Sequence, residues 1–125
     1  MVLVDTSVWI RGLAGQAPYM AEMYRLLAGK EVAGHELVYG ELLIGDRGGR
    51  AKFLAVYEEM YQARMVPHDE VAALVRHRGL YGLGVGWIDV HLLASALAER
   101  MQLWTADAAF AAVAREAGVG YRPAS

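Results

Sequence analysis

An apolar stretch at residues 86–98, which contains a single carboxylate, is the feature that most constrains how this chain can fold. Asp89 lies on the same helical stripe as the apolar residues, and a buried carboxylate is costly unless something compensates its charge. With Gly86 as N-cap, Asp89 would be the N3 residue, where the helix dipole stabilises an anion. A capping role and a chemical role for Asp89 are therefore both open. The apolar residues whose helical spacing predicts a buried helix are Ile88, Leu92, Leu93, Ala96 and Leu97.

Short apolar runs alternate with helical patterns along the chain, and this order is typical of an α/β domain with a parallel sheet. The runs that predict strands are residues 2–4, 31–33, 64–66, 102–105 and 119–122. The patterns that predict helices are residues 7–13, 19–28, 36–44, 51–62, 68–78, 86–98 and 108–117. Residues 79–86 contain four glycines and are expected to form a loop. No repeat or linker interrupts the pattern, so we expect one domain over residues 1–125.

The composition excludes several classes of protein. The chain has no cysteine, so disulfides, thiolate metal sites and cysteine catalysis are ruled out. It begins without a signal-peptide pattern, and no apolar run approaches the roughly 18 residues that cross a bilayer, so we expect a cytoplasmic protein without a membrane segment. Hydrophobic residues make up 56% of the chain, which suits a well-covered sheet or surface buried in a dimer. The net charge of −2 neither indicates nor excludes a polyanionic substrate.

Four acidic residues occupy positions that could bring them together. Asp5 follows the first predicted strand, Asp107 follows the fourth, and Asp89 follows the glycine-rich loop. Ligands of open parallel sheets bind at the carboxyl ends of the strands, so these three acids are expected at one edge. Glu41 lies in the third predicted helix and can reach this edge, and the adjacent mid-helix Gly40 suggests close approach of another group. Simpler interpretations stay open: helix caps for Asp5 and Asp107, and a partly exposed side chain for Glu41.

Clustered carboxylates of this kind repel one another, and their pKa values rise unless a cation neutralises them. Oxygen ligands without a thiol select hard ions, so the four acids predict a site for Mg²⁺ or Mn²⁺. Such an ion lowers the pKa of a bound water and neutralises charge on a scissile phosphate, which fits hydrolysis of a phosphodiester. Packing or surface roles are expected for the four histidines, His35, His68, His77 and His91.

Four motifs in this order resemble the PIN-domain ribonucleases, specifically the VapC-type toxins of bacterial type II toxin–antitoxin pairs. The opening Met-Val-Leu-Val-Asp-Thr-Ser-Val-Trp and the later Glu-Leu-Leu-Ile-Gly match the first two motifs. Gly-Trp-Ile-Asp-Val-His-Leu-Leu-Ala-Ser-Ala and Leu-Trp-Thr-Ala-Asp match the last two. The resemblance covers essentially the whole chain, and all four acidic positions of the family are filled.

The resemblance implies a PIN-domain three-layer α/β/α sandwich around a five-stranded parallel sheet of order 3-2-1-4-5. It implies a metal-dependent endoribonuclease toxin that hydrolyses RNA with a carboxylate-held Mg²⁺, or Mn²⁺ in its place. The implied partners are a cognate VapB-type antitoxin, an RNA substrate and a second copy of the chain in a homodimer. The implied catalytic residues and metal ligands are Asp5, Glu41, Asp89 and Asp107. The residues expected to orient these carboxylates by hydrogen bonds are Thr6, Ser7 and Thr105.

Contacts with the two partners follow from the same resemblance. The candidate RNA contacts are Arg11, Arg47, Arg50 and Lys52. Trp9 or Trp87 could stack on bases, with core packing as the alternative for both. The apolar residues that could form an antitoxin groove, with core packing again the alternative, are Met20, Met23, Tyr24, Leu42 and Tyr57.

Two other functions stay open. A PIN scaffold could grip its antitoxin or RNA without turnover, and RNA binding without cleavage would favour that interpretation. A phosphatase or a phosphate-accepting receiver domain also places aspartates at strand ends, but needs a lysine or a second aspartate near the first. The only lysines, Lys30 and Lys52, do not lie at a strand end. If RNA is cleaved, the substrate could be a tRNA anticodon loop, a ribosomal loop or mRNA.

Overall fold

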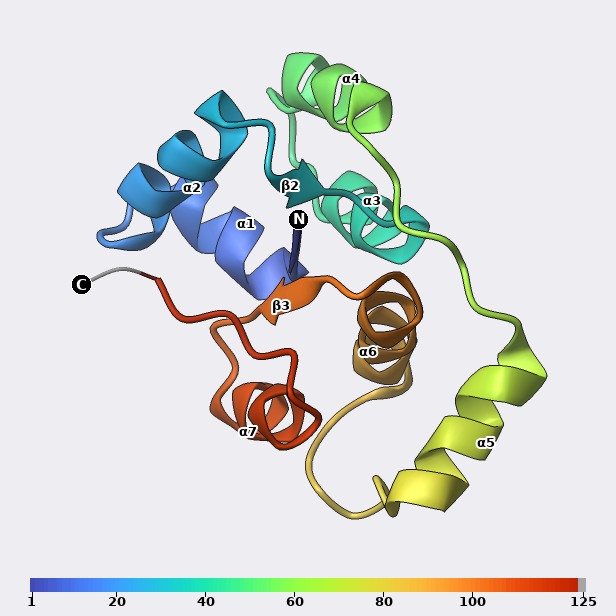
Figure 1. Ribbon diagram of the computed structural model, residues 1–125. Helices are drawn as coiled ribbons and strands as arrows, with labels where there is room; N and C mark the ends of the chain where they lie inside the picture. The colour runs from blue at the N-terminus through green and yellow to red at the C-terminus, as the bar shows by residue number, and fades with distance from the viewer. Residues whose placement is uncertain (124–125) are drawn as a thin grey trace.

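Three short apolar runs form a parallel sheet at the centre of the computed structural model, which describes residues 1–123 (Figure 1). β1 (Val2–Val4) lies between β2 (Val32–Ala33) and β3 (Gln102–Trp104). Every strand residue except Gln102 is buried, as expected for a parallel sheet that is covered on both faces.

The register of the sheet aligns the carboxyl ends of β1 and β3. Val4 pairs with Trp104, and the backbone N–H of Asp5 donates to the carbonyl of Trp104 at 2.9 Å. Asp5 and Thr105, the residues that follow the two strands, therefore lie at the same edge of the sheet. This edge is where the sequence places the acidic residues.

The prediction of two outer strands, at residues 64–66 and 119–122, is wrong. Each outer segment is reduced to one parallel bridge, from Gln62 to Gly34 and from Gly120 to Leu103. Within residues 1–123 the sheet thus has three strands instead of five. The two bridged segments nevertheless lie beside β2 and β3, where the order 3-2-1-4-5 places the outer strands.

Side-chain contacts explain why no strand forms around Arg64. Its backbone N–H donates to the carboxylate of Glu99 at 2.8 Å, and its carbonyl accepts a hydrogen bond from Ser95 Oγ at 2.6 Å. Both backbone groups are therefore satisfied outside the sheet. At the opposite edge the ladder stops shortly after Tyr121, since Pro123 has no N–H to donate.

All seven predicted helices are confirmed within residues 1–123. They are α1 (Thr6–Leu13), α2 (Tyr19–Ala28), α3 (Glu36–Ile44), α4 (Ala51–Glu59), α5 (His68–Arg78), α6 (Trp87–Glu99) and α7 (Ala108–Glu116). The largest boundary error concerns α4, which was expected to reach residue 62. It ends at Glu59 because Met60 turns to an extended backbone with φ −70° and ψ 160°. No helix in this part of the chain has both the length and the apolarity that a membrane crossing requires.

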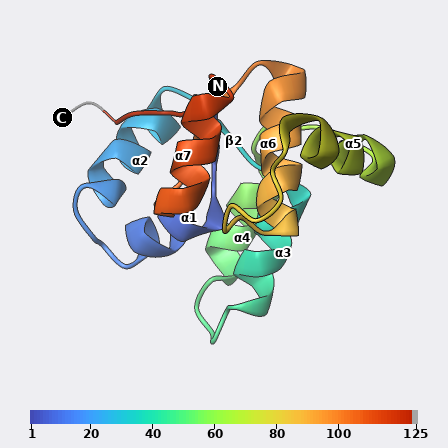
Figure 2. The same cartoon turned by 90° about the horizontal axis from the view of Figure 1, so that it is seen from below.

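The helices cover both faces of the sheet. In Figure 1, α1, α2 and α7 lie on one side of the strands, and α3, α5 and α6 lie on the other. The view from below keeps α7 with α1 and α2, and α5 with α6 (Figure 2). The architecture is the expected α/β/α sandwich, with α5 packed on α6 and α4 on α3.

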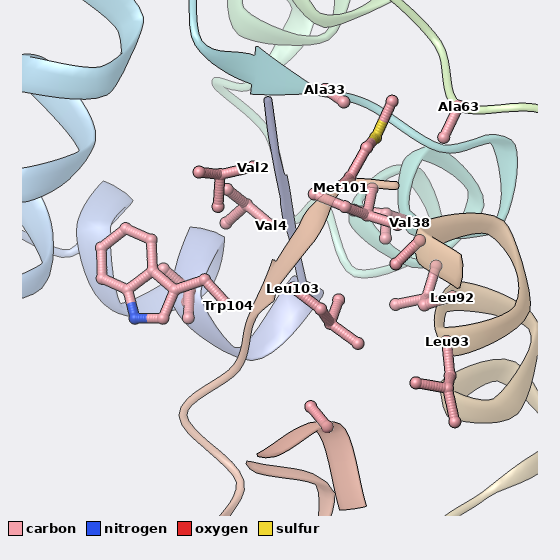
Figure 3. Close-up of a cluster of buried hydrophobic side chains, with 14 of the residues drawn as sticks. Val2, Val4, Ala33, Val38, Ala63, Leu92, Leu93, Met101, Leu103 and Trp104 are labelled. Carbon is pink, nitrogen blue, oxygen red and sulfur yellow. The ribbon is translucent and has the colours of Figure 1, made fainter. Parts of the chain in front are cut away.

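The helix predicted from the apolar stretch, α6, is buried along its middle. Every residue from 90 to 96 is buried, and Leu92 and Leu93 belong to the same core cluster as Leu103 of β3 (Figure 3). Burying one leucine side chain contributes about 1.5–3 kcal/mol, so this packing holds α6 firmly against the sheet. The first turn, with Asp89, is only partly buried and lies outside this core. Packing thus fixes the helix while its N-terminus is available for other contacts.

Candidate active site

Asp5 is a buried carboxylate held by two hydroxyl groups. Its side chain is 6% exposed, and Oδ2 accepts hydrogen bonds from Ser7 Oγ at 2.7 Å and from Thr105 Oγ1 at 2.8 Å. Asp5 precedes α1, but its side chain makes no capping hydrogen bond. The capping interpretation of Asp5 is therefore wrong. The carboxylate is oriented by residues from both strand ends.

Glu41 reaches the same region from the middle of α3. Its Oε1 accepts a hydrogen bond from Thr6 Oγ1 at 2.6 Å, which ties α3 to the first residue of α1. The close approach suggested by the neighbouring Gly40 is wrong, because a Cβ built there would meet no atom within 4 Å. Glu41 is thus placed by a side-chain hydrogen bond and not by tight backbone packing.

Asp89 and Asp107 both cap helices, as the simpler interpretation of each predicts. Asp89 Oδ2 accepts from the backbone N–H of Gly86 at 2.9 Å, and Asp107 Oδ1 accepts from that of Phe110 at 2.8 Å. Each of these bonds uses a single carboxylate oxygen. Capping therefore orients the two side chains at helix N-termini and is compatible with a further ligand.

Three of the acids act electrostatically on the fourth, Asp89. The pKa of Asp89 is raised, first by burial and then by the negative charges of Asp5, Asp107 and Glu41, while the Gly86 N–H works in the opposite direction. Three carboxylates, one after β1, one in α3 and one just before α7, therefore disfavour ionisation of the fourth, in α6. A cation in their midst would remove this repulsion.

The Mg²⁺ or Mn²⁺ site stays a prediction. Within residues 1–123, no group of three or more His, Cys, Asp or Glu side chains could hold a metal ion as these side chains stand. The carboxylates accept hydrogen bonds from hydroxyl and backbone N–H donors. The set of donors nevertheless fits a hard divalent cation, because it is made of carboxylate oxygens without a thiol.

We expect Asp89→Asn to raise the thermal midpoint of the metal-free protein by roughly 3 °C. A carboxyl group whose pKa is raised on folding costs stability at every pH above its folded pKa, and the neutral amide removes that cost. The asparagine Oδ1 can still accept from Gly86. Thermal unfolding in a chelator, followed by circular dichroism, measures the change. Asp46→Asn, in an exposed loop turn, is the matched control, and a gain no larger than that of the control would contradict the prediction.

Comparison with known proteins places the chain in a family. The PIN-domain family profile matches residues 2–116. The chain is also 42% identical over 120 residues to Ribonuclease VapC32 of Mycobacterium tuberculosis, in two strains, which covers 95% of this chain and 94% of that protein. This chain belongs to the PIN-domain family. The crystal structure of PAE2754 from Pyrobaculum aerophilum shares the fold, with a TM-score of 0.58 and 18% identity over 89% of this chain and 82% of that one.

Two basic residues of this PIN domain that were expected to contact RNA are engaged with its own backbone. Arg11 Nη1 donates to the carbonyl of Ser7 at 2.9 Å, and Arg50 Nη1 donates to that of Leu42 at 3.2 Å. Both are partly buried, whereas the other two basic residues are exposed. RNA contacts stay a prediction for all four, Arg11, Arg47, Arg50 and Lys52.

The two tryptophans considered as stacking platforms differ in accessibility. Trp9 is 1% exposed, with ring centroids 5.3 Å from Phe53 and 5.6 Å from Tyr57, so it belongs to the core and a stacking role for it is wrong. Trp87 is 43% exposed and lies 5.1 Å from the ring of His68. Stacking by Trp87 stays a prediction for this PIN domain.

The candidate antitoxin-groove residues also differ in accessibility. Leu42 and Tyr57 are completely buried in the core, so they are unavailable to a partner and the groove role is wrong for both. Met20 and Tyr24 are exposed beside a cavity of about 260 Å³, which Met23 also lines. The cavity has walls from α1, α2 and α4 of this PIN domain.

His35 belongs to a buried polar network that the sequence did not predict. His35 and His91 are buried and the other two histidines are exposed, so the predicted packing or surface roles are confirmed. The hydrogen bond between His35 Nε2 and Ser95 Oγ, at 3.0 Å, was not predicted. The available signal was Ser95 itself, a hydroxyl in the apolar middle of a helix.

Proposed function

We propose that this PIN-domain protein is a metal-dependent endoribonuclease and the toxin of a VapBC-type toxin–antitoxin pair. The observation that carries the proposal is the interaction of four acids from separate elements, in which the charges of Asp5, Asp107 and Glu41 raise the pKa of Asp89 in addition to its burial. The relative in M. tuberculosis, 42% identical over nearly its whole length, is named a ribonuclease, which supports the same reaction here.

The proposed cofactor is Mg²⁺, with Mn²⁺ as a substitute. The residues that would hold the ion are Asp5, Glu41, Asp89 and Asp107. When bound, the ion supplies a water of lowered pKa and neutralises charge that develops on the scissile phosphate.

The chain itself prepares these carboxylates. Ser7 and Thr105 fix the rotation of the Asp5 carboxylate through Oδ2, and Thr6 holds one oxygen of Glu41. Backbone N–H groups hold one oxygen of each of the two helix-capping aspartates. Since four carboxylates are already partly ordered, less conformational freedom is lost when they bind a cation.

The alternative is a PIN scaffold that binds antitoxin or RNA without turnover. The hydrogen bonds of the four carboxylates to hydroxyl and N–H donors are compatible with this alternative, because they form without a metal ion. The test of the proposed function must therefore detect broken RNA and not only bound RNA.

The test is sequencing of RNA 5′ ends after a brief pulse of expression. We expect new ends at one or a few sites in cells that express the wild-type chain, and none in cells that express Asp89→Asn, because the amide weakens cation binding. Asp46→Asn, an exposed loop variant, should give the wild-type pattern. Identical 5′-end profiles for wild type and Asp89→Asn would overturn the proposal in favour of the non-catalytic module.

The proposed partners are a VapB-type antitoxin, the RNA substrate and a second copy of the chain. For the antitoxin we propose the cavity between α1, α2 and α4, because Tyr24 is 65% exposed at its rim. An apolar side chain inserted there would cover surface that is now open to water. A cytoplasmic site of action stays a prediction, as does the homodimer.

A further inference from the structure

A chain of buried hydrogen bonds joins the N-terminus of α3 to the middle of α6. His35, which precedes α3, is completely buried, as is Ser95 of α6. His35 Nδ1 accepts from the backbone N–H of Leu37 at 3.0 Å, and His35 Nε2 lies 3.0 Å from Ser95 Oγ. Ser95 Oγ in turn donates to the carbonyl of Arg64 at 2.6 Å.

The chemistry of the partners fixes the direction of every bond. The Leu37 N–H can only donate, so Nδ1 of His35 is the acceptor and its proton sits on Nε2. The Arg64 carbonyl can only accept, which commits the Ser95 hydroxyl proton to it. Nε2–H of His35 therefore donates to Ser95 Oγ, and a single neutral tautomer satisfies all four groups.

The His35–Ser95 bond lies at the same offset from two of the acids. Glu41 follows His35 by six residues along α3, and Ser95 follows Asp89 by six residues along α6. At 1.5 Å per residue, each acid lies about 9 Å along its helix axis from the bond. The bond joins the N-terminus of α3 to the middle of α6, and the two helices share the core cluster through Val38 and Leu92 (Figure 3). The bond therefore lies at a matched offset, along each helix, from the acid that this helix carries.

We propose that the His35–Ser95 hydrogen bond is a brace that sets the separation of α3 and α6, and so positions Glu41 and Asp89 for a shared divalent cation. The inference rests on the proposed function. His35 and Ser95 are positioning residues, since neither is among the residues that would touch the ion. Glu41 is also hydrogen-bonded to Thr6 of α1, so the brace adds a directional link from this pair to α6.

Packing alone does not account for a polar pair at this place. Ser95 lies between Ala94 and Ala96 in the most apolar part of α6, and alanine has the higher helix propensity. Apolar contacts are also non-directional and tolerate small shifts between helices, whereas a buried hydrogen bond works only over a narrow range of distance and angle. A brace therefore fixes helix spacing more closely than the surrounding leucines and valines do.

Two variants remove the His35–Ser95 hydrogen bond, one by changing each partner. A third variant controls for a loss of folding stability alone. Ser95→Ala removes the hydroxyl. His35→Asn retains an oxygen that can cap Leu37, but its side chain is too short to reach Ser95. Tyr57→Phe is the control, because the Tyr57 hydroxyl bonds only the backbone of His35, accepting from its N–H at 2.8 Å and donating to its carbonyl at 3.4 Å, and makes no bond to the imidazole or to Ser95.

The readout is the affinity for Mn²⁺ alone, measured by titration calorimetry without RNA at a temperature where every variant is folded. We expect each brace variant to bind Mn²⁺ about 10-fold more weakly than wild type, and the double variant to be no weaker than the singles. Tyr57→Phe should lower the thermal midpoint and keep the wild-type affinity.

Wild-type Mn²⁺ affinity in both brace variants would overturn the brace, and so would an equal loss in Tyr57→Phe. Either result would leave the proposed function standing, provided that wild type binds Mn²⁺ and Asp89→Asn does not. Absence of Mn²⁺ binding by wild type would overturn the metal-dependent function itself and the brace with it.

Discussion

Replacing Asp5 by asparagine should lower the rate of RNA cleavage about 1,000-fold while the protein stays folded. Asn Oδ1 can still accept from Ser7 and Thr105, so the hydrogen bonds at the ends of β1 and β3 survive. What the substitution removes is the negative charge nearest the centre of the sheet edge. Because a divalent cation is held by charge, the amide should depress catalysis far more than stability.

The hydroxyls around Asp5 should give a smaller, graded effect. Thr105→Val removes one of the two donors to Oδ2 and is expected to cost about 10-fold, whereas Thr105→Ser keeps the donor and should cleave close to the wild-type rate. Single-turnover cleavage of the mapped RNA at saturating Mg²⁺ measures all three variants, with Asp46→Asn as the matched loop control. Cleavage by Asp5→Asn at more than a tenth of the wild-type rate would remove Asp5 from the proposed ion site.

The position of the acids could be predicted from the sequence because it depends on local patterns. A buried apolar run followed by a carboxylate and a helix marks a strand end, and the parallel arrangement brings such ends to one edge. Asp5 and Asp107 follow β1 and β3 in this way. A helix cap produces the same local pattern, so the sequence alone could not distinguish a capping aspartate from one that does not cap its helix. The structure does: Asp107 caps its helix and Asp5 does not.

The loss of the outer strand at residues 64–66 could not be predicted, because it depends on distant side chains. The backbone of Arg64 is satisfied by Glu99 and Ser95, which lie 35 and 31 residues further along the chain. An apolar run followed by Pro67 looks like a strand at the level of local propensity. Its hydrogen-bond partners, which come from α6, decide otherwise.

Periodicity shows that a helix has an apolar face but not which neighbour covers it. Tyr24 and Tyr57 both lie on helical stripes, yet Tyr24 is 65% exposed and Tyr57 is completely buried. The His35–Ser95 bond joins residues 60 positions apart and left no local trace beyond a serine among alanines. Such tertiary contacts determine whether a polar residue in the core is hydrogen-bonded or is left without a partner.

A fall in pH should destabilise this protein through His35 before most carboxylates titrate. Burial, reinforced by the nearby His91, lowers the pKa of His35 from its ordinary 6.5 to about 4. Between these two values the unfolded chain binds a proton that the folded chain excludes, so stability is fully present above pH 6.5 and is lost as the pH falls towards 4. The full loss is about 3 kcal/mol for this group, a large share of the stability of a small domain.

Urea unfolding at several pH values between 7 and 4.5 measures this contribution of His35. The quantity to compare between variants is the slope of the free energy of unfolding against pH. His35→Asn has no imidazole to protonate, so its free energy of unfolding should fall less steeply with acid than that of wild type. His77→Asn, a substitution on the surface of α5, should retain the wild-type slope. The pKa of His91 is also lowered, first by burial and then by His68, so part of the acid sensitivity should persist in His35→Asn. Equal slopes for wild type and His35→Asn would mean that His35 accepts a proton in the folded state. The single neutral tautomer that joins Leu37, Ser95 and Arg64 would then be wrong.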